Sequence, residues 1–454
     1  MASPSRGRAR QAVRVGGFAD SLNIRASPRV PIAIPAYHFP GSAPGHWEAD
    51  VRRFLCFRLA RATMFLCVGL ALVTAPRSGN AQSFPAAIDG STTGNHFGVD
   101  LTFKGANGSA PTGALIQDAV GNLYATTSTG GYGSGVVFKL DSSHHQTVLH
   151  AFTGPDGATP YGALAMDSFG NIYGTTSAGG DAGLGTVFKI DTQGIETVIH
   201  SFTGAPDGAN PYAGLVIGSS GILYGTTENG GTSGCGTLFK IDTTGVENVL
   251  HSFAGGPTDG ADPKASLILD LDGNLYGTTL AGGSSGYGTV FELDLRNTET
   301  ILYNFTGGSG GGNPFGGVTR DANGVLYGTT ETGGGSLSRP YGCCKGTVYA
   351  LIGNHQIVLY SFSGGNDGGM PVSNLVLYNG VLYGTTLLGG PSQKGTVFRV
   401  SIGTGGESVL HGFTGKGDGG APQGGLLMDA KGTLYGTAEG GGQFMKGTVY
   451  QQSQ

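Results

Sequence analysis

The chain has 454 residues, of which 88 are Gly, 12% are charged and 38% are hydrophobic. This balance excludes a highly charged disordered chain, and the glycines lack the strict every-third-residue period of collagen. The first 81 residues carry 11 Arg and three acidic residues, whereas from Gln82 onward 14 basic residues face 27 acidic ones. The acidic part offers no basic patch, so we expect no nucleic-acid partner.

The segment before the repeats has the features of an export signal. Residues 1–50 have no apolar period, and we expect them to be unstructured or to lie upstream of a true translation start at Val51. Residues 51–81 combine arginines, an apolar run from Ala62 to Ala75 and small residues before Gln82, as secretory signals do. The run is shorter than the roughly 20 residues of a transmembrane helix. We therefore predict a signal peptide at 51–81, a lead-in at 82–97, and an extracellular or periplasmic protein without a transmembrane segment in the mature chain.

The rest of the chain is an internal repeat of about fifty residues. The motif Leu-Tyr-Gly-Thr-Thr, or a close variant, recurs seven times, with its tyrosine at Tyr124, Tyr173, Tyr224, Tyr276, Tyr327, Tyr383 and Tyr435. Each copy divides into four segments of strand length, which in the second copy are residues 163–167, 171–175, 186–191 and 196–202. Four strands in each of seven copies predict an all-β fold, a seven-bladed β-propeller over residues 98–454.

The two ends of the repeat region complement each other. The last copy stops in its third strand, at residues 448–454, and a strand-like segment at 99–103 precedes the first copy. We expect this N-terminal strand to be the fourth strand of the last blade, because it would close the ring without a free sheet edge.

Two recurring features indicate packing and turns. Aromatic residues return at fixed positions in every copy, for example Phe138, Phe188 and Phe239, and such columns are typical of a core. The first two strands of most copies are joined by Asp-x-x-Gly, as at Asp118 and Gly121, which suits a type I turn.

The segments GNLYGTTxxGG, GTVFKI and LHSFTG resemble the tandem repeat of the bacterial extracellular GloVer ("choice-of-anchor") family. The resemblance covers all seven copies, from about Gly98 to Tyr450. It implies a secreted or surface-exposed, propeller-like protein, and it brings no catalytic residues with it. Members often end in an anchoring segment, whereas this sequence ends at Gln454 inside the repeat, so release or periplasmic residence is expected rather than surface attachment.

The long loops after the fourth strands carry the candidate ligand-binding residues. Five copies contain Asp-Gly-x-x-Pro, with the aspartates Asp156, Asp207, Asp259, Asp367 and Asp418. One interpretation is a ring of carboxylates around the central mouth of the propeller, able to bind Ca²⁺ or a polyhydroxylated ligand. The other is that Asp-Gly serves the turn before the inner strand, and repetition favours this structural role.

Other candidate groups receive structural interpretations. His150, His200, His251 and His411 share one register with Tyr303 and Tyr360, and tyrosine replaces histidine in packing and hydrogen bonding but not as a metal ligand. Glu228, Glu331 and Glu439 follow the Thr-Thr motif in alternate copies, and without a base nearby we expect solvated loop residues. After the leader the cysteines are Cys235, Cys343 and Cys344, which form neither a disulfide framework nor a zinc motif.

The sequence therefore favours a secreted, non-catalytic binding or structural module over an enzyme. The alternative is a carbohydrate-active enzyme with carboxylates at the propeller mouth. We expect a monomer whose partner is a glycan or a cell-surface component, and no cofactor other than Ca²⁺ at the five aspartates.

Overall fold

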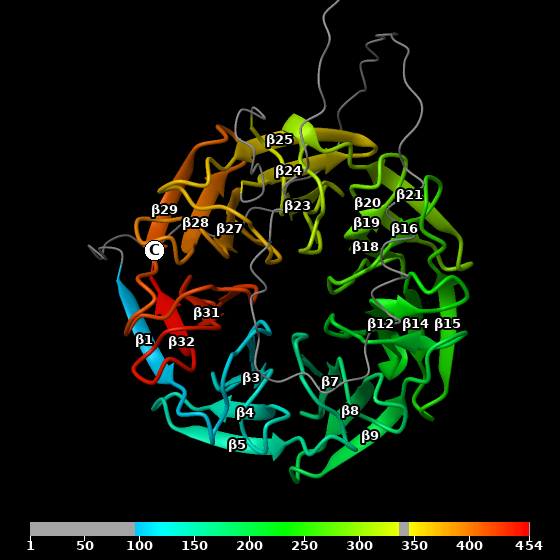
Figure 1. Ribbon diagram of the computed structural model, residues 1–454, viewed down its shortest axis with the longest axis vertical. Coiled ribbons are helices and arrows are strands. Elements are labelled where there is room, and N and C mark those ends of the chain that lie inside the picture. The colour runs from blue at the N-terminus through cyan, green and yellow to red at the C-terminus, as the bar shows by residue number, and fades with distance from the viewer. Residues whose placement is uncertain (1–95, 336–344, 454) are drawn as a thin grey trace, which may run out of the picture. The chain divides into compact units, whose positions relative to one another are not determined.

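The computed structural model describes residues 96–335 and 345–453, all within the unit Val51–Gln454. These residues form seven four-stranded antiparallel sheets arranged around a central axis (Figure 1). The fold is a seven-bladed β-propeller, as the seven sequence repeats of four strands each predicted. The predicted segments 1–50 and 51–81, and all but the end of 82–97, lie outside the described residues.

Each blade runs from a short inner strand to a longer second strand. The inner strands are β2 (Ile116–Gln117), β6 (Ala165–Met166), β11 (Val216–Ile217), β17 (Ile268–Leu269), β22 (Thr319–Arg320), β26 (Val376–Tyr378) and β30 (Leu427–Met428). The second strands are β3 (Leu123–Thr127), β7 (Ile172–Thr176), β12 (Leu223–Thr227), β18 (Leu275–Thr279), β23 (Leu326–Thr330), β27 (Val381–Thr386) and β31 (Leu434–Ala438).

The third and fourth strands complete each sheet, and the fourth lies on the outside of the ring. The third strands are β4 (Val136–Leu140), β8 (Thr186–Ile190), β14 (Thr237–Ile241), β20 (Thr289–Leu293), β24 (Thr347–Ile352), β28 (Thr396–Ser401) and β32 (Thr448–Gln452). The outer strands are β5 (Gln146–Ala151), β9 (Glu196–Ser201), β15 (Glu247–Ser252), β21 (Glu299–Asn304), β25 (His355–Ser361), β29 (Glu407–Gly412) and β1 (Phe97–Thr102).

Small elements decorate the loops. Two-residue strands pair β10 (Gly208–Ala209) with β13 (Asn229–Gly230), and β16 (Gly260–Ala261) with β19 (Ala281–Gly282). Single 3₁₀ turns, η1 (Ser219–Gly221) and η2 (Gly308–Gly310), are the described helical segments. None of the described residues belongs to a helix long and apolar enough to cross a membrane.

The strand β1 closes the ring. It pairs antiparallel with β32, in a register that places Phe97 opposite Gln452 and Thr102 opposite Thr448. The ring of Phe97 also stacks on His411 of the neighbouring blade, with centroids 3.6 Å apart. The predicted closure of the last blade by an N-terminal strand is confirmed, and it pairs the edge of β32 that would otherwise be free.

The core lies between neighbouring sheets and consists of the recurring aromatic residues. Phe152, Phe188, Phe202 and Phe239 are completely buried. Phe152 of one blade meets Phe188 of the next edge to face at 5.1 Å, and Phe202 meets Phe239 in the same way at 5.2 Å. This geometry adds to the burial energy of the rings, so the columns hold adjacent blades together as predicted.

The inner strands are shorter than the sequence suggested. Residues 163–167 were expected as a strand, whereas β6 contains only Ala165 and Met166. A Cβ atom on Gly162 would lie 2.6 Å from backbone atoms of Ala213 in the next blade. The chain here leaves its own sheet and packs against the neighbouring inner strand, so only the second half of the segment pairs within the blade.

The two faces of the ring differ in their connections. On one face the short turns follow the predicted Asp-x-x-Gly pattern. The Asp118 carboxylate accepts hydrogen bonds from the backbone of Val120 and Asn122 and from the hydroxyl of Tyr124. On the other face, the long loop that connects two blades pairs with the loop between the second and third strands of the blade it enters, as Ala158 does with Ala178. Function is expected on this second face, here called the loop face, because scaffolded loops commonly carry it.

Candidate functional site

One residue from every blade lines a common cavity of about 200 Å³ at the centre of the loop face. Each follows the proline that ends a long loop and precedes an inner strand. The residue before that proline has a left-handed backbone, with φ between 51° and 56° in all seven copies. None of these seven residues is a glycine, and other residues rarely adopt this conformation. This turn directs the chain to the axis. We call the seven lining positions the central mouth: Thr112, Tyr161, Tyr212, Lys264, Phe315, Val372 and Gln423.

Aromatic side chains dominate one side of the central mouth. The rings of Tyr161 and Tyr212 are stacked, with centroids 4.4 Å apart and an interplanar angle of 15°. Phe315 meets Tyr212 edge on at 5.8 Å. Burial, followed by the negative charges of Glu439 and Glu228, raises the pKa of the Tyr161 hydroxyl. The three rings form an apolar surface that carries hydroxyl groups and faces a small cavity.

A buried ion pair lies beside these rings. The ammonium of Lys264 is 3.1 Å from Oε1 of Glu228, and the two side chains are 18% and 11% exposed. The same ammonium lies 5.3 Å from the ring centre of Tyr212 and 5.8 Å from that of Phe315. A cation shared between a carboxylate and aromatic faces is held in place, so Lys264 is an ordered part of the central mouth.

The glutamates that follow the Thr-Thr motif were expected to be solvated, and the structure corrects this. Glu228 is only 9% exposed and is paired with Lys264. Burial raises the pKa of Glu331, an effect that the charge of Lys264 partly offsets, and burial also raises the pKa of Glu439. These glutamates act on Lys264 and Tyr161 of the central mouth. Carboxylates therefore lie beside the central mouth, although they are not the aspartates singled out from the sequence.

The aspartates of the Asp-Gly loops lie instead at the outer edge of the ring. Asp156 accepts hydrogen bonds from the backbone and hydroxyl of Thr153, at 2.8 and 2.9 Å, and lies 2.9 Å from Nε2 of His150 on the outer strand β5. Although burial acts in the opposite direction, these hydrogen bonds keep the pKa of Asp156 below its ordinary value. Asp156 thus serves the turn, as the structural interpretation held.

The other four aspartates repeat this arrangement between other pairs of blades. Asp207, Asp259 and Asp418 lie 3.3, 3.2 and 3.1 Å from Nε2 of His200, His251 and His411. Asp367 instead accepts a hydrogen bond of 3.0 Å from the hydroxyl of Tyr360, so tyrosine replaces histidine in the way the sequence suggested. The five aspartates therefore belong to separate places around the rim and do not converge.

The remaining candidates add no further site. Cys235 is buried, and its thiol lies 3.7 Å from the backbone carbonyl oxygen of Ser233, and Cys343 and Cys344 lie outside the described residues. Tyr161, Tyr212, Lys264 and Phe315 were missed by sequence reasoning. A signal was available: the residue after the loop proline differs in nearly every copy, whereas its neighbours recur.

Comparison with known proteins supports the fold and the repeat. The family described as the Gloeobacter/Verrucomicrobia repeat matches residues 74–216, 193–342 and 339–454. No curated protein matches the chain. A virginiamycin B lyase from Staphylococcus aureus is similar in structure, with a TM-score of 0.54 and 14% identity over 80% of this chain and 100% of that one. A gluconolactonase from Xanthomonas campestris reaches 0.38 and 12%, over 61% and 84%. At these identities the likeness to the lyase shows the fold alone, and that to the gluconolactonase carries no argument.

Proposed function

The chain belongs to the Gloeobacter/Verrucomicrobia repeat family, and we propose that it is a secreted, non-catalytic binding module for a neutral, hydroxyl-rich ligand such as one end of a glycan. The ligand would enter the central mouth on the loop face. The observation that carries this proposal is the aromatic surface of Tyr161, Tyr212 and Phe315 beside the buried pair of Lys264 and Glu228.

The chemistry of the central mouth suits a small neutral ligand. Ligand sites combine apolar and aromatic walls with a few placed polar groups. Here the rings offer faces for the C–H groups of a sugar, and Lys264, Glu228 and the tyrosine hydroxyls offer hydrogen bonds. The cavity of about 200 Å³ is smaller than a typical drug site, so only the end of a longer ligand would fit.

Charge argues against an anionic ligand. The part of the sequence after residue 81 is acidic, with 27 acidic against 14 basic residues. The one lysine of the central mouth is neutralised by Glu228. A surface of like sign repels polyanions and lowers their rate of association, so a neutral glycan is favoured over an acidic polysaccharide.

The alternative is a carbohydrate-active enzyme that uses the carboxylates of the mouth. Burial raises the pKa of Glu331 and Glu439, which is the direction that a general acid requires. Such an enzyme would release products from a bound oligosaccharide, and replacing either glutamate by Gln would abolish that release without abolishing binding.

The experiment measures binding of neutral oligosaccharides to the full chain by calorimetry, with heparin as the polyanion. We expect binding that weakens at least tenfold in Phe315→Ala. The matched control is Phe169→Ala, because Phe169 is 81% exposed in a short turn on the opposite face, and this variant should bind like the parent. Equal binding by both variants, or a preference for heparin, would contradict the proposal, and products seen by chromatography would favour the enzyme.

Export is part of the same proposal. The arginines and the apolar run of residues 51–81 support cleavage near Ala81 and secretion of the mature chain. The N-terminus of the protein recovered from the culture fluid or the periplasm should begin at about Gln82. Recovery of an uncleaved chain from the cytoplasm alone would contradict secretion.

A further inference from the structure

Three equivalent clusters of metal-ligating side chains occur among the described residues, each between two adjacent blades. They are His150, Asp156 and Glu196; His200, Asp207 and Glu247; and His251, Asp259 and Glu299. In each, the histidine lies on an outer strand, the aspartate in the loop that follows, and the glutamate at the start of the next outer strand. We call these the three His-Asp-Glu seams, and they join the first four blades of the ring.

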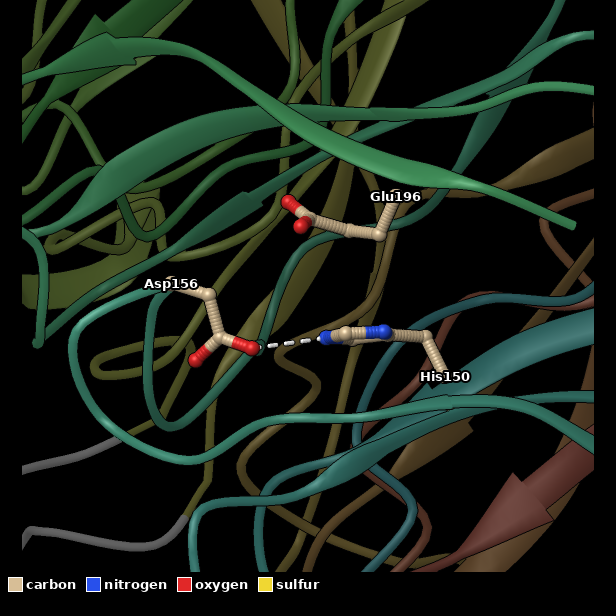
Figure 2. Close-up of side chains that lie close together, drawn as sticks. All are labelled: His150, Asp156 and Glu196. Carbon is tan, nitrogen blue, oxygen red and sulfur yellow. Dashed lines mark hydrogen bonds and ion pairs between the residues drawn. The ribbon is translucent and has the colours of Figure 1, made fainter.

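The polar ends of each cluster meet in one small space. In Figure 2 the carboxylates of Asp156 and Glu196 and the imidazole of His150 approach one another from three segments. The ligand atoms of each cluster all lie within 4.8 Å of one another. The side chains of His150 and Asp156 are each 21% exposed, so an ion could reach the space from solvent.

The spacing fits a tetrahedral metal ion. Nε2 of the histidine lies 2.9, 3.3 and 3.2 Å from the aspartate oxygen in the three seams. Two ligands of a tetrahedral zinc ion, with bonds of about 2.0–2.2 Å, lie about 3.3–3.5 Å apart. The imidazole and the first carboxylate therefore stand near the required separation, and only the glutamate has to move closer.

The glutamates supply a second, independent indication. Oε1 of Glu196, Glu247 and Glu299 is buried and has no hydrogen-bond partner among the described residues. A buried carboxylate oxygen without a partner is costly. A dication would satisfy this oxygen.

We propose that the three His-Asp-Glu seams each bind one divalent transition-metal ion, with Zn²⁺ as the fitting ion, and that the bound metal links neighbouring blades. One nitrogen and two carboxylate oxygens, completed by water, form the donor set. Imidazole favours Zn²⁺ and similar ions, whereas Ca²⁺ takes oxygen ligands. A metal ion bound through the histidine thus takes the place of the calcium expected at the loop aspartates.

Another seam provides a natural contrast. Between the fifth and sixth blades the residues are Tyr360, Asp367 and Glu407, and Oε1 of Glu407 is again buried, with no hydrogen-bond partner in the described part of the chain. Here the tyrosine hydroxyl donates to Asp367, and burial together with that carboxylate raises the tyrosine pKa. A protonated hydroxyl is a poor metal ligand. This seam should therefore bind no metal ion, although it has the same two carboxylates as the three His-Asp-Glu seams.

The test measures zinc bound to the full chain by equilibrium dialysis after removal of metals with a chelator. We compare the parent with the triple variant Glu196→Gln, Glu247→Gln and Glu299→Gln. Gln already occupies this register at Gln146 and Gln356, so the variant should fold. We expect the parent to bind three more zinc ions than the triple variant. Zinc should also raise the Tm of the parent by several degrees and leave the variant unchanged.

Two further variants sharpen the result. Glu407→Gln should bind as much zinc as the parent, because its seam lacks the histidine. Tyr360→His should bind one ion more, since it completes a fourth His-Asp-Glu set. Equal zinc binding by the parent and the triple variant, or a rise in Tm with Ca²⁺ and none with Zn²⁺, would overturn the proposal. Binding at the central mouth should be unaffected by any of these changes.

Discussion

The interior of the blades and the central mouth are built by the same repeat, yet the residue type is nearly constant between copies in the first and differs between copies in the second. The third strand carries a buried aromatic residue in every copy: Phe138, Phe188, Phe239, Phe291, Tyr349, Phe398 and Tyr450. At the central mouth, the seven copies carry Thr112, Tyr161, Tyr212, Lys264, Phe315, Val372 and Gln423. Six residue types thus occupy seven equivalent positions on one surface, against two types in the core.

The difference follows from what each position meets. A third-strand aromatic faces the preceding blade, as Phe188 faces Phe152. Every copy therefore has the same surroundings and needs a similar side chain. The mouth residues converge on one axis, where seven side chains share a single small cavity. An asymmetric ligand needs different groups around it, so a binding site requires different residues at these seven equivalent positions. The core, in contrast, requires the same kind of residue in every copy.

Removing the closing strand should have the largest effect on stability. Deletion of residues 96–103 takes away β1 and Phe103, which is completely buried, and leaves β32 as an unpaired edge. We expect aggregation or a Tm lower by more than about 10 °C. The control Val99→Ser changes a side chain that is 38% exposed in the same strand and should keep the parent Tm. A deletion variant that stays monomeric with an unchanged Tm would contradict the role of β1.

Replacing a phenylalanine by alanine should lower stability much more in the core than at the central mouth. Phe239→Ala removes a completely buried ring and should lower the free energy of unfolding by about 3–5 kcal/mol. Phe315→Ala removes a partly exposed ring at the central mouth and should cost about 1 kcal/mol. Urea denaturation measures both. A loss of stability as large for Phe315 as for Phe239 would mean that the mouth residue is part of the core.

The fold was predictable because its determinants are local and repeated. The motif Leu-Tyr-Gly-Thr-Thr gives the second strand, and Asp118 shows that the Asp-x-x-Gly turn forms as expected, with the Tyr124 hydroxyl bonded to the aspartate. Because the last copy lacks a fourth strand, the sequence predicted that an N-terminal strand completes this blade, and β1 does pair with β32. Only the inner strands were expected too long, since their first halves pack on the neighbouring blade rather than within the sheet.

The sites were less predictable because they depend on contacts between blades. Tyr161 and Tyr212 stack although they are a whole repeat apart, and the ion pair of Glu228 with Lys264 joins two copies. Likewise, no local pattern connects Asp156 with Glu196, which approach only when the outer strands lie side by side. The role of the aspartates in their turns could be predicted from the sequence. The residues that contact them from the next blade are known only from the folded ring.

The smallest expected effect is a dependence of stability on pH at the seam without a histidine. Burial, and then the negative charge of Asp367, raises the pKa of Glu407 from 4.5 to about 7. Between these values the unfolded chain loses the proton while the folded chain keeps it, so the parent becomes less stable as pH rises through this window. The Tyr360 hydroxyl, which donates to Asp367, stays protonated throughout because its pKa is raised.

Replacing this glutamate should therefore stabilise the protein only at the higher pH. We expect Glu407→Gln to exceed the parent by about 1 kcal/mol above pH 7, a figure reduced for solvent screening because the side chain is half-buried, and to match it near pH 4.5. The control Asp141→Asn should behave in the opposite way, because the backbone hydrogen bond from His145 lowers the pKa of Asp141. A lowered folded pKa stabilises at neutral pH and is lost on acidification. Tm measured across this range decides the matter, and a Glu407→Gln variant that is less stable than the parent at pH 8 would show that the carboxylate is satisfied in the folded ring.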